Sequence, residues 1–275
     1  MMATIEGLPG PFRTGQIIDM EKGEVLSFDR FIDRIASKEL IFVGENHDNP
    51  EHHLIQVQIL QALMGRFKSI GVAMEFFQKT QQHLLDRYVH GEITEAELLK
   101  ETAWERGWGF YYHYYRPLLL LAKQNGSRIL ALNLPHHIVK KVARQGLKGL
   151  DESEKTQLPE DIDLTNQAHR AFVREAFAKH GHENLKNFDF FYEAQCVWED
   201  TMASHLSDYF KKEKGRLIVF SGNGHIIYKF GIPKRTFNRV PVSMVTIMPY
   251  PVNVKGTLNK GMADYIWLTA GCAAR

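Results

Sequence analysis

Cysteine is scarce in this sequence, which has two, Cys196 and Cys272, among 275 residues. So few thiols exclude a scaffold built from disulfides, a metal site with four thiolates and the covalent attachment of a c-type haem. A reducing compartment such as the cytosol is compatible with this composition, although the composition does not require it.

Long hydrophobic runs and an excess of one charge are also missing. No run of about 18 apolar residues occurs, and residues 1–11 carry neither the basic stretch nor the apolar core of a signal peptide. We therefore expect a soluble, cytoplasmic chain without a transmembrane segment. Lys and Arg number 34 and Asp and Glu 32, spread along the chain, and the net charge is +2. Nucleic acid and anionic membranes are thus not expected partners.

Three common motifs are absent: the nucleophile elbow, the Walker loop and the dinucleotide fingerprint. Residues 221–224, Ser-Gly-Asn-Gly, are rich in glycine and follow an apolar run. They lack the lysine and the following helix pattern of a phosphate loop, so we do not expect phosphate binding there.

Apolar runs that alternate with amphipathic stretches are what the sequence does contain. Residues 40–43 are typical of a buried strand, and a helix is predicted to begin with Asn49 as its N-cap and Pro50 in its first turn. Further strands are predicted at residues 70–74, 128–132, 216–220, 240–248 and 265–268. Helices are predicted at 27–37, 116–125, 135–145, 166–185 and 188–213, and two short helices, joined near His90 and Gly91, at 79–101. This alternation predicts an α/β fold with a mainly parallel central sheet flanked by helices.

The domain organisation follows from the same pattern. We expect a single domain over residues 1–275, with an N-terminal hairpin at 14–27 and helical insertions at about 78–125 and 148–213. The segments at 240–248 and 265–268 are expected at a sheet edge.

Polar side chains follow four successive predicted strands. They are Glu45 and His47, Glu75, Asn133, and Asn223 and His225. The carboxyl ends of parallel strands meet on one side of a sheet, where ligands of α/β proteins bind. Two imidazoles and two carboxylates there suit a divalent metal such as zinc, manganese or iron, or a base with its orienting acid. The alternative is that these residues only cap strand ends.

An aromatic segment lies between residues 104 and 115. Its members are Trp104, Trp108, Phe110, Tyr111, Tyr112, Tyr114 and Tyr115. Packing in a core or a lid is one interpretation, and the wall of a flat porphyrin site with Tyr or His as axial ligand is the other.

Two pairs of neighbouring residues are expected to divide between interior and surface. His52 and His53 fall in a first helical turn, where surface histidine is the ordinary case. Glu199 and Asp200 are consecutive on a helix, so we expect only Glu199 to face inward.

Several of these pieces together resemble the ChaN-like family of iron-regulated, haem-binding proteins, part of the wider group with Tiki proteases and erythromycin esterases. The matching pieces are GENHDNPEHH at 44–53, AMEFF at 73–77, WG at 108–109, YRP at 115–117, ALN at 131–133, AQCVWEDTMA at 194–203 and SGNGH at 221–225. The chain departs from the family pattern in lacking the lipoprotein signal of membrane-anchored members and in having Glu199, not Asp, after Trp198.

This resemblance implies an α/β fold, haem binding linked to iron or haem acquisition, and a homodimer that holds haem between subunits. It also implies that Glu45, His47, Glu75 and His225 correspond to catalytic or metal-binding positions of the hydrolase relatives. Two functions therefore stay open beside a domain without chemistry. One is haem binding, for which the candidate residues are Trp108, Tyr111, Tyr112, Tyr115 and Asn133. The other is a metal-dependent hydrolase that uses the Glu and His cluster.

Overall fold

A computed structural model describes residues 2–179, 187–252 and 258–271. Its centre is an eight-stranded sheet in the order β5-β4-β12-β10-β6-β9-β7-β8. The strands are β4 (Ile17–Asp19), β5 (Glu24–Leu26), β6 (Leu40–Glu45), β7 (Gly71–Gln78), β8 (Ile129–Asn133), β9 (Leu217–Gly222), β10 (Met244–Pro251) and β12 (Tyr265–Thr269). All neighbouring pairs from β12 to β8 are parallel, whereas β4 and β5 form an antiparallel hairpin at one end.

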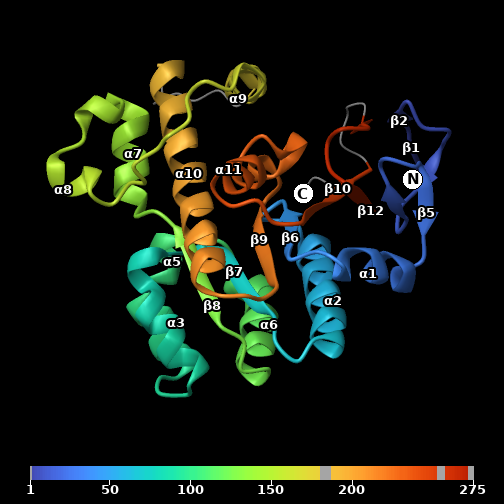
Figure 1. The fold of residues 1–275 in the computed structure, drawn as a ribbon, viewed down its shortest axis with the longest axis horizontal. Helices are drawn as coiled ribbons and strands as arrows, with labels where there is room; N and C mark the ends of the chain where they lie inside the picture. Colours follow the sequence, from blue (N-terminus) through green and yellow to red (C-terminus); the bar gives the residue numbers. More distant parts are fainter. Residues whose placement is uncertain (1, 180–186, 253–257, 272–275) are drawn as a thin grey trace.

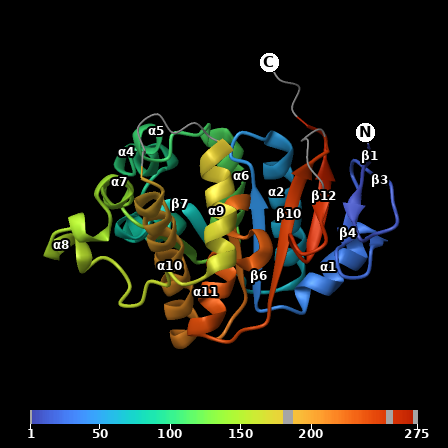
Figure 2. The same cartoon turned by 90° about the horizontal axis from the view of Figure 1, so that it is seen from above.

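Helices cover both faces of this sheet (Figures 1 and 2). They are α1 (Phe28–Ala36), α2 (Pro50–Arg66), α3 (Gln82–Val89), α4 (Glu95–Glu101), α5 (Trp104–Gly107), α6 (Tyr112–Gln124), α7 (His136–Gln145), α8 (Glu152–Lys155), α9 (Gln167–Lys179), α10 (Phe188–Lys212) and α11 (Ile232–Arg239). Short strands β1 (Met2–Ala3), β2 (Ile5–Glu6), β3 (Phe12–Arg13) and β11 (Leu258–Asn259) pair beside the hairpin. No helix of the described ranges is long and apolar enough to span a bilayer.

The residues of β6 show why the strand pattern predicted this architecture. Ile41 and Val43 pack in one core with Ile59 of α2, whereas Leu40 and Phe42 pack on the opposite face with residues of α10. A strand that is buried on both faces needs a continuous apolar run, and every residue of β6 is buried. The sheet therefore forms the middle of three layers.

The predicted fold class is confirmed, including the N-terminal hairpin and the Asn49 cap of α2. The expected position of the last two strands was wrong. β10 pairs with β6 and β12 pairs with β10, so both lie inside the sheet, because the β4–β5 hairpin extends the sheet beyond β12. Residues 180–185 of the predicted helix at 166–185 and Cys272 lie outside the described ranges.

Candidate functional site

The carboxyl ends of β6, β9 and β7 lie side by side and bring the predicted acids and imidazoles together. Glu75 lies inside β7, which continues to Gln78 through an irregular register, rather than after the strand as expected. Its carboxylate reaches across to β9, where the Gly222 N–H donates to Oε2 at 2.7 Å and His225 Nε2 lies 3.3 Å from Oε1. From the other side, Asn133 Nδ2 donates to the Glu75 carbonyl oxygen at 2.9 Å.

Glu45 is the centre of a second set of contacts, made with helices α2 and α6. Its buried carboxylate lies 2.6 Å from His47 Nδ1 and 3.3 Å from His53 Nδ1. It also accepts hydrogen bonds from Gln56 Nε2 at 2.9 Å and from the Tyr115 hydroxyl at 3.0 Å. Four partners fix this carboxylate, so it can hold the His47 ring in one orientation.

His47 is the member of the cluster that solvent reaches, because 27% of its side chain is exposed. Glu45 occupies its Nδ1, and its Nε2 lies above Gly222, where a β-carbon would be 3.1 Å away. Burial opposes the charged ring, but Glu45 and Glu75 outweigh that cost and raise the pKa of His47. The rings of Trp108 and Phe110 pack on it with centroids 4.9 and 4.7 Å away.

His225, in contrast, is held between two carboxylates. Its Nε2 faces Glu75, and its Nδ1 lies 3.2 Å from Glu199 Oε1. Burial disfavours the charged ring, yet the two carboxylates raise the pKa of His225 to about 10. The same ion pair overcomes the burial of Glu75 and lowers its pKa to about 2. Both His225 nitrogens therefore face carboxylates that favour the protonated ring, which leaves His47 with the available ring nitrogen.

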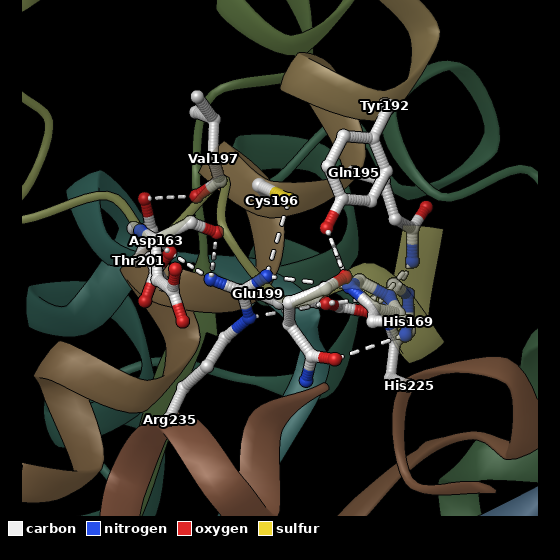
Figure 3. A network of polar contacts seen from close by, with 12 residues as sticks. Asp163, His169, Tyr192, Gln195, Cys196, Val197, Glu199, Thr201, His225 and Arg235 are labelled. Carbon is white, nitrogen blue, oxygen red and sulfur yellow. Dashed lines mark hydrogen bonds and ion pairs between the residues drawn. The ribbon is translucent and has the colours of Figure 1, made fainter. Parts of the chain in front are cut away.

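A charged network continues behind His225 and joins helices α9, α10 and α11 (Figure 3). Glu199 Oε2 lies 3.3 Å from Arg235 Nε and 3.4 Å from His169 Nε2. Arg235 also pairs with Asp200, whose other oxygen lies 2.9 Å from an Arg239 nitrogen. The network thus balances buried acids with buried bases and ties three helices to the strand ends.

Two sequence-based expectations about neighbouring residues are wrong. Glu199 and Asp200 are both fully buried, because α11 covers the side of α10 that Asp200 occupies and supplies Arg235. His52 and His53 are also buried, at 0% and 2% exposure. His52 is neutral, since burial lowers its pKa to about 3, and it bridges the Asn46 N–H and Thr269.

The residues predicted to bind a cofactor differ in how far they are exposed to solvent. Tyr115 is buried and donates to Glu45, and this burial raises the pKa of Tyr115. Asn133, at the end of β8, is buried and donates to the Glu75 carbonyl of β7. Burial also raises the pKa of the half-buried Tyr112. Trp108 borders His47, and Tyr111 is 62% exposed. The structure thus brings Trp108 to the imidazole and leaves Tyr111 open to solvent.

Other contributors to the site were not predicted from the sequence. Gln56 and His169 lie in predicted helices whose patterns mark only an apolar face, and Arg235 lies in α11, a helix that was not predicted. In retrospect, a polar or charged residue at a core-facing helical position is the signal that could have found them. Within the described ranges, no group of three or more His, Cys, Asp or Glu side chains is arranged to hold a metal ion.

Comparison with known structures gives the same architecture. The structure described as cofacial haem binding to ChaN of Campylobacter jejuni aligns with a TM-score of 0.72 and 21% identity, over 91% of this chain and 95% of that chain. An erythromycin esterase variant in its open conformation aligns with a TM-score of 0.49 and 11% identity, over 86% of this chain and 76% of that chain. The first match shows the fold, and the second is too distant to bear on activity.

Comparison with known sequences adds a plant relative and a family. Protein RETICULATA-RELATED 5, chloroplastic, of Arabidopsis thaliana is 21% identical over 268 residues, which are 88% of this chain and 35% of that protein. This chain therefore spans about a third of the length of that relative. A family model described as haem-binding uptake, Tiki superfamily, ChaN matches residues 31–236. Because this match covers most of the chain, the protein belongs to the ChaN family of the Tiki superfamily.

Proposed function

We propose that this protein binds haem at the carboxyl edge of its sheet, beside His47, as part of iron or haem handling. The family supports haem as the cargo, and the partly exposed imidazole of His47 is the observation that carries the proposal. A neutral imidazole nitrogen is a common axial ligand of haem iron. The other candidate imidazole, His225, is enclosed by Glu75 and Glu199.

The surroundings of His47 fit a haem ligand. Glu45 accepts the hydrogen bond from Nδ1, so the lone pair of His47 lies on Nε2. A carboxylate behind a ligating histidine fixes the ring and increases its basicity. The Glu45 carboxylate is itself held by Tyr115 and Gln56, so the histidine is oriented before haem arrives.

An apolar surface for the porphyrin lies next to this ring. Phe110, whose ring centroid lies 4.7 Å from that of His47, is 36% exposed, and the next residue, Tyr111, is 62% exposed. Large exposed apolar side chains that gather around a ligand atom are typical of binding sites. Tyr111 is also the exposed phenol of the segment, so it is the alternative iron ligand. Tyr115 is not, because its hydroxyl donates to Glu45.

A hemin titration tests the proposal. We expect wild-type protein to give a saturable Soret shift in the low micromolar range. His47→Ala should weaken binding about tenfold or more, which is about 1.4 kcal/mol. His83→Ala, which removes an exposed histidine of α3, is the matched control and should bind like wild type. A Soret maximum that moves in Tyr111→Phe but not in His47→Ala would assign the iron to Tyr111, and the absence of any saturable shift would refute haem binding.

A second candidate function has its own observation, the 2.6 Å contact between Glu45 and His47. Such a pair can act as a general base, with His47 Nε2 taking a proton from water and Glu45 orienting the ring. Glu75 and the His225 cation would complete a hydrolase site without a metal. The predicted divalent metal at Glu45, His47, Glu75 and His225 is a separate hypothesis, for which elemental analysis of the purified protein is the test.

Ester and amide substrates separate this candidate from haem binding. If the site is hydrolytic, Glu45→Gln and His47→Ala should each lower the rate about a hundredfold or more, the ordinary contribution of a general base. If wild type and both variants gave no rate above that of the uncatalysed reaction, only the haem proposal would remain.

A further inference from the structure

A cavity of about 650 Å³ lies at the opposite edge of the sheet, where the parallel strands begin. Its lining includes Asp19 at the end of β4 and Asp264 just before β12. Three lysines from separate segments also line it, namely Lys38 before β6, Lys229 after β9 and Lys260 in the turn after β11. This volume is in the range of small-molecule sites, and neither proposed function uses it.

The carboxylate of Asp19 is already occupied within the protein. Its Oδ1 accepts the N–H groups of Glu21 and Lys22 at 3.1 and 3.0 Å. Its Oδ2 lies 2.5 Å from an Arg34 nitrogen, and the side chain is 8% exposed. A cation that entered the cavity would have to displace these donors before it could bind Asp19.

Asp264 is occupied in the same way. Its Oδ2 accepts the backbone N–H and the hydroxyl of Thr246 at 2.8 and 3.0 Å. Its Oδ1 accepts Lys229 Nζ at 2.7 Å. Both aspartates of the cavity are therefore neutralised and hydrogen-bonded, and neither is free to attract a cation.

The lysines of the cavity, unlike its aspartates, still have ammonium protons available for a ligand. Within the described ranges, Lys38 and Lys260 form no ion pair, and Lys229 has two ammonium protons left after its bond to Asp264. The exposed Glu21 is the acid of the lining that has no partner in an ion pair among these residues. The uncommitted charge of the cavity is therefore positive.

The backbone that delivers Lys229 is strained. Tyr228 and Lys229 have φ angles of 53° and 58°, a conformation that residues with a side chain rarely adopt, and here two adopt it in succession. The Tyr228 N–H donates to the Met262 carbonyl at 2.8 Å, and the Lys229 N–H donates to the Ile226 carbonyl at 2.9 Å. Strain that is maintained by such contacts is commonly found where a side chain must be aimed at a ligand.

We propose that this cavity binds a small polyanion, with two or more carboxylate or phosphate groups held by Lys38, Lys229 and Lys260. The lysines come from three separate segments, so they can contact different groups of one ligand. A molecule with a single charge would leave at least one of these ammonium groups without a partner.

Calorimetric titration with citrate and with pyrophosphate, at constant ionic strength, tests the site and distinguishes the two chemistries. We expect saturable binding of at least one of them by wild-type protein. Lys38→Gln and Lys260→Gln should each weaken it about tenfold, because each removes one charge-assisted contact. Lys148→Gln, which removes an exposed lysine of another region, should bind like wild type. Equal affinity in all four proteins, or no saturable binding of either anion, would overturn the proposal.

A competition experiment separates this site from the haem proposal. The cavity and His47 lie at opposite edges of the sheet, so saturating hemin should leave the affinity for the anion unchanged. Displacement of the anion by hemin would overturn the assignment to this cavity. Failure of hemin to bind would leave the anion result unaffected.

Discussion

At the scale of single residues, His225 and Glu75 depend on each other for their charge. The pKa of His225 is about 10 in the folded protein, above the value of about 6.5 in an unfolded chain. Its contribution to stability is therefore complete below pH 6.5 or so and is lost as the pH rises through about 10. The pKa of Glu75 is about 2, so its contribution is present above about pH 4.5 and is lost as the pH falls through about 2.

We expect the free energy of unfolding to fall between pH 7 and pH 10 because His225 must lose a proton on unfolding. One such group contributes a slope of at most about 1.4 kcal/mol per pH unit. Urea denaturation at several pH values in wild type and His225→Asn measures this slope, which should be smaller in the variant. His83→Asn should keep the wild-type slope, and equal slopes in wild type and His225→Asn would contradict the assigned charge.

Several residues of the site could be predicted from the sequence, but their chemical states could not. Glu45, His47, Glu75 and His225 were identified because each follows or ends an apolar run, and the structure places them together. The difference in protonation and exposure between His47 and His225 was not predictable. Whether an imidazole is enclosed by acids, as His225 is, or partly exposed, as His47 is, depends on side chains from helices far away in the sequence.

At the scale of elements, α11 explains how a helix of ordinary pattern becomes part of the site. Arg235 points from α11 into α10, where it pairs with Glu199 and Asp200 and donates to Cys196 Sγ at 3.1 Å. Burial raises the pKa of that thiol to about 12, so Cys196 is an acceptor here and not a nucleophile. The helix therefore holds α10 through charge as well as through apolar packing.

Arg235→Met should destabilise the protein by about 3–5 kcal/mol, because it removes the buried cation that Glu199 and Asp200 share. Lys234→Met changes the neighbouring, exposed residue of the same helix and should stay within about 0.5 kcal/mol of wild type. Urea denaturation of the three proteins gives both values. Arg235→Lys, which keeps the charge but not the forked geometry, should fall between them. A loss below about 1 kcal/mol in Arg235→Met would show that the network does not hold the helices together.

At the scale of the whole molecule, the exposed aromatic surface beside His47 bears on the predicted homodimer. Phe110, which packs on His47, and the next residue, Tyr111, form an exposed aromatic patch at the edge where haem is proposed to bind. A porphyrin on this patch would keep one face open to a second copy. We therefore expect hemin to shift the mass in light scattering from 31.7 kDa toward twice that value.

Tyr111→Ala should weaken this hemin-dependent association, and Val25→Ala, at an exposed position of β5, is the control that should associate like wild type. A mass of one chain at saturating hemin would contradict the predicted dimer. A mass of two chains without hemin would show that haem is not what joins them.

The sequence by itself determined the layered architecture and the edge of the sheet that carries the candidate site. Apolar runs such as that of β6 identify buried strands, and Asn49 and Pro50 identify the start of α2, because these signals depend on local periodicity and capping. The motifs around Glu45 and His225 also indicated the family that the match of a family model to residues 31–236 confirmed.

Only the tertiary structure decided the order of the strands and the environment of each charge. The hairpin of β4 and β5 joins the sheet beyond β12, and α11 buries Asp200, through contacts between segments far apart in the chain. Such contacts leave no local pattern in the sequence. They nevertheless set the protonation of His225 and the exposure of His47, and so decide which of the two imidazoles is available for chemistry.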